Sequence, residues 1–407
     1  MNLRERTRKL LLEHAGQYPC LQAGDILKYL HQSAFGCEHL VSSLDTAVER
    51  IAAERRQTAI NPDRLTEPLD GEYSRVHLGW LERGLSAHTL GKLFVMSAQT
   101  EPDGVSVLRD KLAVALELAR DGKLPVAAAV LESAAGEWQK NGCQPMHHSD
   151  SFRENYNPAY RVISNRFVPF LPLLAAVDRL LESDRPAVVA IEGGSASGKS
   201  TLGSLFEALY DCTLLHMDDF FLQVHQRTPE RFAEAGGNVD RERFLLEVLQ
   251  PLHQNKPIEY RRFDCAAMSL LPAVTLRPKK LTVVEGAYSM HPELASYYDL
   301  TAFLDIAPEV QKKRIEKRNT PAFAKRFFEQ WIPMEEQYFR TLQVKNRCDI
   351  VIPITEYQKR GEDHLAFVIR LFQDRPLLPI TTLGVCLTLL VSPAAFWGHT
   401  LSLLHTA

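Results

Sequence analysis

The sequence predicts an α/β protein in which a parallel β-sheet, with helices on both faces, follows a mostly α-helical domain. Three observations lead to this fold class. As far as residue 140, apolar residues recur at the helical spacings of three and four. After residue 187, short apolar runs typical of buried parallel strands alternate with helical stretches. A glycine-rich loop joins the first of these runs to a helix.

The composition is that of an ordinary globular protein. The 407 residues predict two to three domains at about 150 residues each. Hydrophobic residues make up 45% and charged residues 24%, which excludes collagen-like, coiled-coil and wholly disordered chains. A formal net charge of −3 gives no chain-wide attraction for nucleic acid, so no nucleic-acid partner is expected. The seven cysteines include no CxxC pair, and the N-terminus lacks the apolar core of a secretion signal, so we expect a cytoplasmic protein.

Residues 1–160 are expected to form the helical domain, for which no motif indicates a function. The polar segment at its end, residues 140–161, is interrupted by Pro145 and Pro158, and we interpret it as an ordered loop or a domain edge. Polar residues that could supply a metal site in this domain are Glu38, His39, His77, His147 and His148. Because no HxxxH or HExxH spacing is present, hydrogen-bonded structural histidines are the favoured interpretation, with a second small-molecule or regulatory site as the alternative.

The parallel sheet is expected within residues 173–375. The runs predicted to be its buried strands are 187–191, 213–216, 281–284, 302–306 and 349–352. The tail that follows, residues 376–407, carries no charged side chain. We interpret the tail as a packed helix or a poorly ordered end, with a membrane anchor as the alternative, since glycine, proline and polar residues dilute its apolar stretch.

The glycine-rich loop matches the phosphate-binding pattern GxxxxGK[ST] at every fixed position. It comprises Gly193, Gly194, Ser195, Ala196, Ser197, Gly198, Lys199 and Ser200, and Thr201 continues it into a predicted helix. Glycines let successive backbone N–H groups wrap a phosphate, and the helix N-terminus adds partial positive charge. Lys199 is expected to reach the β and γ phosphates of a nucleotide, and Ser200 to offer its hydroxyl to Mg²⁺. The loop therefore predicts a nucleotide as a ligand, with Mg²⁺, and by itself does not indicate a reaction.

Acidic residues follow two further predicted strands. Asp218 and Asp219 come directly after the strand at 213–216, and Glu285 follows the strand at 281–284. Open parallel sheets bind ligands at the carboxyl ends of their strands, so these carboxylates are expected near the loop. Asp218 could accept the proton of an attacking hydroxyl, and Glu285 could hold the metal or its water. A helix cap and a surface turn are the respective alternatives.

Together these motifs resemble the uridine kinase family and its relatives, over about residues 173–372. The resemblance implies that Asp218 is the base for the substrate hydroxyl and that Glu285 helps to hold Mg²⁺. It also implies that Asp240, in the run Gly236–Asp240, holds the sugar hydroxyls of the substrate, with a helix cap as the alternative. Tyr260 falls where these kinases carry a Tyr-Asp-Phe segment of the substrate site, although the His that follows is missing and the Asp is displaced.

The predicted helix after the strand at 302–306 is rich in basic residues. Arg314 and Arg318 are four residues apart and share one helix face. They resemble the basic lid of these kinases, which implies that they neutralise charge during transfer. A merely solvated basic face is the alternative.

The expected function is therefore an ATP-dependent kinase that transfers the γ-phosphate to a hydroxyl of a small metabolite. The acceptor implied by the resemblance is a nucleoside such as uridine, or a related ribosyl compound. An ATP-binding regulatory protein, whose P-loop domain controls the N-terminal domain with little phosphoryl transfer, is the alternative. ATP and a small hydroxyl-bearing metabolite are the expected partners; a homo-oligomer stays open, and a membrane is expected only if the tail anchors the chain.

Overall fold

The computed structural model describes residues 2–37, 43–57, 61, 63–70, 72–98 and 104–355. They form two compact units, one within Met1–Arg179 and the other within Leu180–Glu356. The predicted bounds of the two domains and the tail stay predictions, and the tail at 376–407 lies outside the described residues. In the part of the chain that is described, no helix is both long and apolar enough to cross a membrane.

The first unit is mostly helical, as predicted. Its helices are α1 (Leu3–Gln17), α2 (Ala23–Phe35), α3 (Leu44–Gln57), α4 (Gly79–Glu82), α5 (Ala87–Ala98), α6 (Gly104–Arg120), α7 (Ala128–Lys140) and α8 (Asp150–Tyr156). Local signals set several of these boundaries: Asn2 and Glu5 form a reciprocal capping box at the start of α1. The apolar stripe of α6 packs on α1 and α2, which buries Leu112, Ala115 and Leu118.

The first unit also contains a small antiparallel sheet that the sequence analysis did not predict. Its strands are β1 (Thr66–Pro68), β2 (Tyr73–His77) and β3 (Tyr160–Ser164), in the order β1-β2-β3. The interpretation of residues 140–161 as a loop is therefore corrected in part, because α8 and the start of β3 lie there. The strand forms because its backbone pairs with β2, about 90 residues earlier, and local periodicity cannot reveal such a pairing.

The second unit is built on the predicted parallel sheet. Its strands are β4 (Ala187–Gly193), β5 (Cys212–His216), β8 (Leu281–Glu285), β9 (Leu300–Ile306) and β10 (Ile350–Ile354), in the order β10-β9-β4-β8-β5, with parallel pairing throughout. Every residue of β4 and β8 is buried, as expected for strands covered on both faces. The chain leaves β4 towards β5 on one side and later crosses to β9 on the other. Such a reversal of strand order is where open sheets bind ligands.

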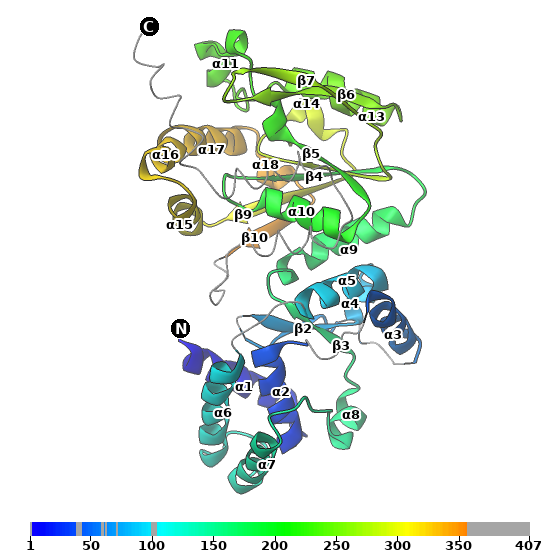
Figure 1. Ribbon diagram of the computed structural model, residues 1–407, viewed down its shortest axis with the longest axis vertical. Helices are drawn as coiled ribbons and strands as arrows, with labels where there is room; N and C mark the ends of the chain where they lie inside the picture. The colour runs from blue at the N-terminus through cyan, green and yellow to red at the C-terminus, as the bar shows by residue number, and fades with distance from the viewer. Residues whose placement is uncertain are drawn as a thin grey trace. The chain divides into compact units, whose positions relative to one another are not determined.

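Helices and a hairpin surround this sheet (Figure 1). The α-helices are α10 (Lys199–Leu209), α11 (Pro229–Ala233), α12 (Arg241–Phe244), α13 (Gln250–His253), α14 (Pro292–Ala295), α15 (Pro308–Arg318), α16 (Pro321–Arg326), α17 (Ile332–Thr341) and α18 (Val344–Arg347). The helix α9 (Leu171–Leu181) belongs to the first unit as far as Arg179. Single π-helical turns continue α12 into α13 (Leu245–Leu249) and α16 into α17 (Phe327–Trp331). The hairpin strands β6 (Ile258–Asp264) and β7 (Ser269–Leu276) lie apart from α15, α16 and α17 in the same view.

Candidate active site

The glycine-rich loop lies between β4 and α10, as its motif requires. The strand ends at Gly193 and the helix begins at Lys199. Ala196 and Gly198 adopt positive φ angles of 60° and 105°, which curl the backbone so that its N–H groups converge. A side chain at Gly193 would lie 2.7 Å from the carbonyl oxygen of Leu304, so β9 leaves room only for glycine there. These features form a cradle for an anion at the N-terminus of α10.

Side chains from α10 and α15 contact this loop. Lys199 Nζ donates to the carbonyl oxygens of Gly193 and Gly194 at 2.8 and 3.0 Å. On α15, Arg314 Nη1 donates to the carbonyl oxygens of Ala196 and Ser197 at 3.0 and 3.3 Å. The predicted basic helix therefore contacts the glycine-rich loop, and its role as a lid stays a prediction.

The two predicted acidic positions meet beside the loop. Asp218 lies in the turn after β5, and Glu285 is the last residue of β8. The pKa of the Asp218 carboxyl is raised, first by the protein that surrounds it and then by the negative charge of Glu285. Burial acts to raise the pKa of Glu285 as well, but hydrogen bonds and charges from His216 and Lys199 outweigh it and hold that pKa below its usual range.

This arrangement fits a magnesium ion. Interaction with the Ser200 side chain also acts to lower the pKa of Glu285, so a hydroxyl and an ionised carboxylate lie near each other at the start of α10. Mg²⁺ prefers oxygen ligands and commonly takes one or two carboxylates together with waters and phosphate oxygens. The described residues contain no group of three or more His, Cys, Asp or Glu side chains placed to hold a metal, so protein groups alone would not complete its coordination.

The predicted substrate residues lie on the hairpin side of this edge. Asp240 caps α12: its carboxylate accepts from the backbone N–H of Arg243 at 3.2 Å and from the guanidinium of Arg243 at 3.4 Å. Asp240 thus makes the helix cap that was the alternative interpretation. The binding of sugar hydroxyls by Asp240 stays a prediction. Tyr260 on β6 is buried and stacks on Phe220.

Arg318, the second arginine that was predicted to belong to a lid, lies in the last turn of α15. Burial lowers the pKa of the Arg318 guanidinium, and the negative charge of Asp218 acts in the opposite direction. The same group lies 6.0 Å from the centre of the Phe327 ring. Arg318 is therefore electrostatically linked to the proposed base, while its part in transfer stays a prediction.

Three side chains of this region were not predicted from the sequence. Nδ1 of His216 lies 2.6 Å from Oε1 of Glu285, and Glu335 of α17 contacts the P-loop at Ser195. Arg243 donates to Asp240 and lies over the Phe220 ring at 4.5 Å. One signal could have found His216: it is the last residue of the strand that leads into Asp218, and so it lies at the carboxyl edge of the sheet. For Glu335 no local pattern exists.

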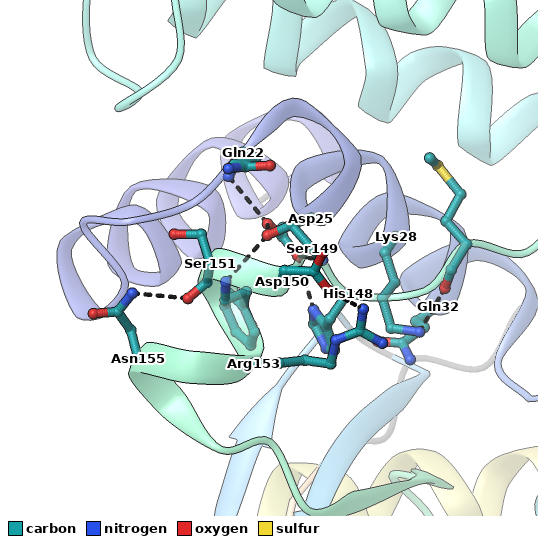
Figure 2. Close-up of polar contacts among 12 residues, drawn as sticks. Gln22, Asp25, Lys28, Gln32, His148, Ser149, Asp150, Ser151, Arg153 and Asn155 are labelled. Atoms are coloured by element: carbon teal, nitrogen blue, oxygen red, sulfur yellow. Dashed lines mark hydrogen bonds and ion pairs between the residues drawn. The ribbon is translucent and has the colours of Figure 1, made fainter.

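A second concentration of ionisable side chains lies in the first unit, around Asp25 of α2 (Figure 2). Asp25 is fully buried and accepts from the N–H and hydroxyl of Ser149 at 3.0 and 2.6 Å. It also lies 3.0 Å from Nδ1 of His148, whose Nε2 is 2.6 Å from the hydroxyl of Tyr160. Because a carboxylate can only accept, we assign the His148 proton to Nδ1, and Nε2 then accepts from the phenol.

This network continues through a fully buried arginine. Arg75 donates two hydrogen bonds to the amide oxygen of Gln32, at 3.0 and 2.9 Å, and one to Glu67 at 3.0 Å. Glu67 is also 2.8 Å from Nδ1 of His14 and 3.6 Å from Nε2 of His77. Buried charges are tolerated when they are paired in this way, and here they join α1, α2 and the small sheet.

His77 and His148 therefore face acidic side chains, in keeping with the favoured structural interpretation. His147 is exposed. Glu38 and His39, the other two residues considered for a metal site, lie outside the described residues.

Comparison with known proteins places uridine kinases among the similar sequences. No family model matches the chain. Uridine kinase-like protein 3 of Arabidopsis thaliana is 23% identical over 209 residues, which are 46% of this chain and 42% of that protein. The uridine kinase of Brevibacillus brevis is 24% identical over 198 residues, which are 44% of this chain and 91% of that enzyme. This chain thus spans less than half the length of the Arabidopsis relative.

Two solved structures are also similar. A possible uridine kinase from Bacillus stearothermophilus is 20% identical, with a TM-score of 0.34, and the match covers 44% of this chain and 98% of that one. A putative fructose transport system kinase from Silicibacter is 21% identical, with a TM-score of 0.38 and the same coverage of both chains. About 45% of this chain is thus similar in sequence to uridine kinases.

Proposed function

We propose that this protein is an ATP- and Mg²⁺-dependent kinase that transfers the γ-phosphate to a hydroxyl of a small metabolite. One observation carries the proposal. The P-loop, Asp218 and Glu285 stand at the carboxyl ends of β4, β5 and β8, and in the registered sheet Glu285 pairs with both Ile191 and His216. Sequence similarity to uridine kinases supports a nucleoside or another ribosyl compound as the acceptor.

Each group has a defined part in this reaction. The N–H groups of the P-loop and the ammonium of Lys199 bind the phosphates and balance their charge. Asp218 accepts the proton of the acceptor hydroxyl, and a raised pKa makes it a stronger base than an ordinary aspartate. Ser200 and Glu285 would hold Mg²⁺, which when bound neutralises charge on the phosphate oxygens.

An ADP-release assay with the full chain tests the proposal. The acceptor panel contains nucleosides, polyols and hydroxy acids. We expect acceptor-dependent ADP release with at least one of them. ATP binding without acceptor-dependent turnover would instead favour the ATP-binding regulatory protein, and a chain that binds no ATP would contradict both functions.

A further inference from the structure

A buried carboxylate lies against the phosphate-binding loop. Glu335 of α17 is 5% exposed, and its carboxylate accepts from the backbone N–H of Ser195 at 2.8 Å and from the Ser195 hydroxyl at 2.6 Å. Ser195 is the third residue of the GxxxxGK[ST] motif. A negative group is unexpected in a loop whose N–H groups are arranged to receive anions, because like charges repel.

Two side chains of α15 also contact this stretch, but they donate hydrogen bonds to it, whereas Glu335 accepts them. Gln311 donates to the carbonyl oxygen of Ser195 at 2.8 Å, and Arg314 donates to that of Ala196 at 3.0 Å. Both use acceptors of the loop, which a phosphate does not need. Glu335 uses two donors, and a phosphate oxygen that approaches the Ser195 N–H has to replace the carboxylate there.

The surroundings of Glu335 disfavour its negative charge. Burial raises the pKa of its carboxyl, although the charge of Lys199 and the hydrogen bonds from Ser195 act in the opposite direction. Phosphates bound beside Lys199 would add further negative charge within a few ångströms. The favourable electrostatic influence of Lys199 on the Glu335 carboxylate and its contact with Ser195 would then both weaken.

We propose that Glu335 competes with the nucleotide phosphates for the P-loop, and so lowers nucleotide affinity and links phosphate binding to a movement of α17. The inference rests on the proposed ATP site. When nucleotide binds, release of Glu335 would free α17 from the loop. Nucleotide binding would thereby affect the helices that follow α15. If the Glu335–Ser195 contact were purely structural, weakening it would have the opposite effect on nucleotide affinity. The loop would become less ordered and would bind nucleotide more weakly.

Isothermal titration calorimetry of ADP with the full chain separates these roles. The test variant is Glu335→Gln, which removes the charge and keeps the size, and the matched control is Glu336→Gln, because Glu336 is the exposed neighbour on the same helix. We expect Glu335→Gln to bind ADP about three to ten times more tightly than the unaltered chain, the range for removal of one nearby like charge. Glu336→Gln should stay within about twofold of the unaltered chain, because exposed charges are screened.

Thermal unfolding without nucleotide supplies the second readout. Glu335→Gln should unfold at the same or a lower temperature, since it weakens contacts with Ser195 while it improves ADP binding. Equal or weaker ADP binding by Glu335→Gln, in a chain that is still folded, overturns the inference. If the unaltered chain and both variants bind no ADP, the proposed function fails, and this inference fails with it.

Discussion

Among single residues, substitutions of Lys199 and of Asp218 should have different effects on ATP binding and on phosphoryl transfer. Lys199→Ala removes the charge that faces the phosphates, so nucleotide binding and turnover should fall together. Asp218→Asn keeps the shape and removes the base, so ATP binding should survive while transfer falls by about 10² to 10⁴. Calorimetry with ATP, together with ADP release in the presence of the best acceptor, measures both effects.

Transfer close to the unaltered rate in Asp218→Asn would remove Asp218 from the mechanism. Phosphoryl transfer has a loose transition state, in which the nucleophile is weakly engaged, so a base contributes less than in other reactions. Glu285 and Asp219 would then be the carboxylates to substitute, and a change in Mg²⁺ dependence would identify the metal ligand.

The buried pair of Asp25 and His148 should make the stability of the first unit depend on pH. Burial lowers the pKa of His148 from 6.5 to about 4, although the hydrogen bond to Asp25 acts to raise it. Burial raises the pKa of Asp25, but hydrogen bonds from His148 and Ser149 outweigh it and bring the value to about 2. In both cases the unfolded chain binds more protons than the folded chain, so the free energy of unfolding decreases as the pH is lowered. The decrease due to His148 occurs between pH 6.5 and 4, and the decrease due to Asp25 between pH 3.8 and 2.

Between pH 7 and pH 5 the His148 contribution should be about 2 kcal/mol. Urea unfolding of the full chain, followed in the first unit by hydrogen exchange of the paired β2 and β3, measures it. His148→Gln should flatten this dependence. His147→Gln, at the exposed neighbour, should leave it unchanged, and an equal slope in both variants would contradict the assignment to His148.

At the scale of elements, the turn after β8 should tolerate no side chain. Gly286 has a φ of 147°, and a Cβ there would lie 2.5 Å from the Cβ of Met217, which precedes Asp218. Gly286→Ala should therefore destabilise the second unit by about 1–3 kcal/mol and should also lower turnover, because it displaces the turns that carry Glu285 and Asp218.

A glycine in the first unit supplies the control. Gly136 lies inside α7, and a Cβ there would meet nothing within 4 Å. Gly136→Ala should stabilise the chain by about 0.5–1 kcal/mol, because alanine loses less backbone entropy in a helix. Thermal unfolding of both variants tests the pair, and a neutral Gly286→Ala would show that the β8 turn adapts.

At the scale of the whole molecule, the two compact units should separate when the chain between them is cut. The residues after α9, from Glu182 to Pro186, are exposed, while the strands on either side are paired within their own units. Limited digestion with a protease that cleaves after glutamate should therefore cut at Glu182 and leave two resistant fragments. Initial cuts inside either sheet, identified by mass spectrometry, would contradict independent units.

Local spacing along the chain was sufficient to predict several parts of this protein. The strand runs, the P-loop and the placement of Asp218 and Glu285 after their strands all follow from periodicity and a contiguous motif. Parallel strands expose their carboxyl ends at one edge, so the meeting of these groups could be inferred without coordinates.

Contacts between residues far apart in the chain could not be predicted from the sequence and became known from the tertiary structure. β3 exists because β2 pairs with it, and Glu335 reaches Ser195 across 140 residues. His148 faces Asp25 across 123 residues. Such contacts leave no periodic trace in the sequence, because chain folding and side-chain packing bring the partners together and no local backbone preference encodes them.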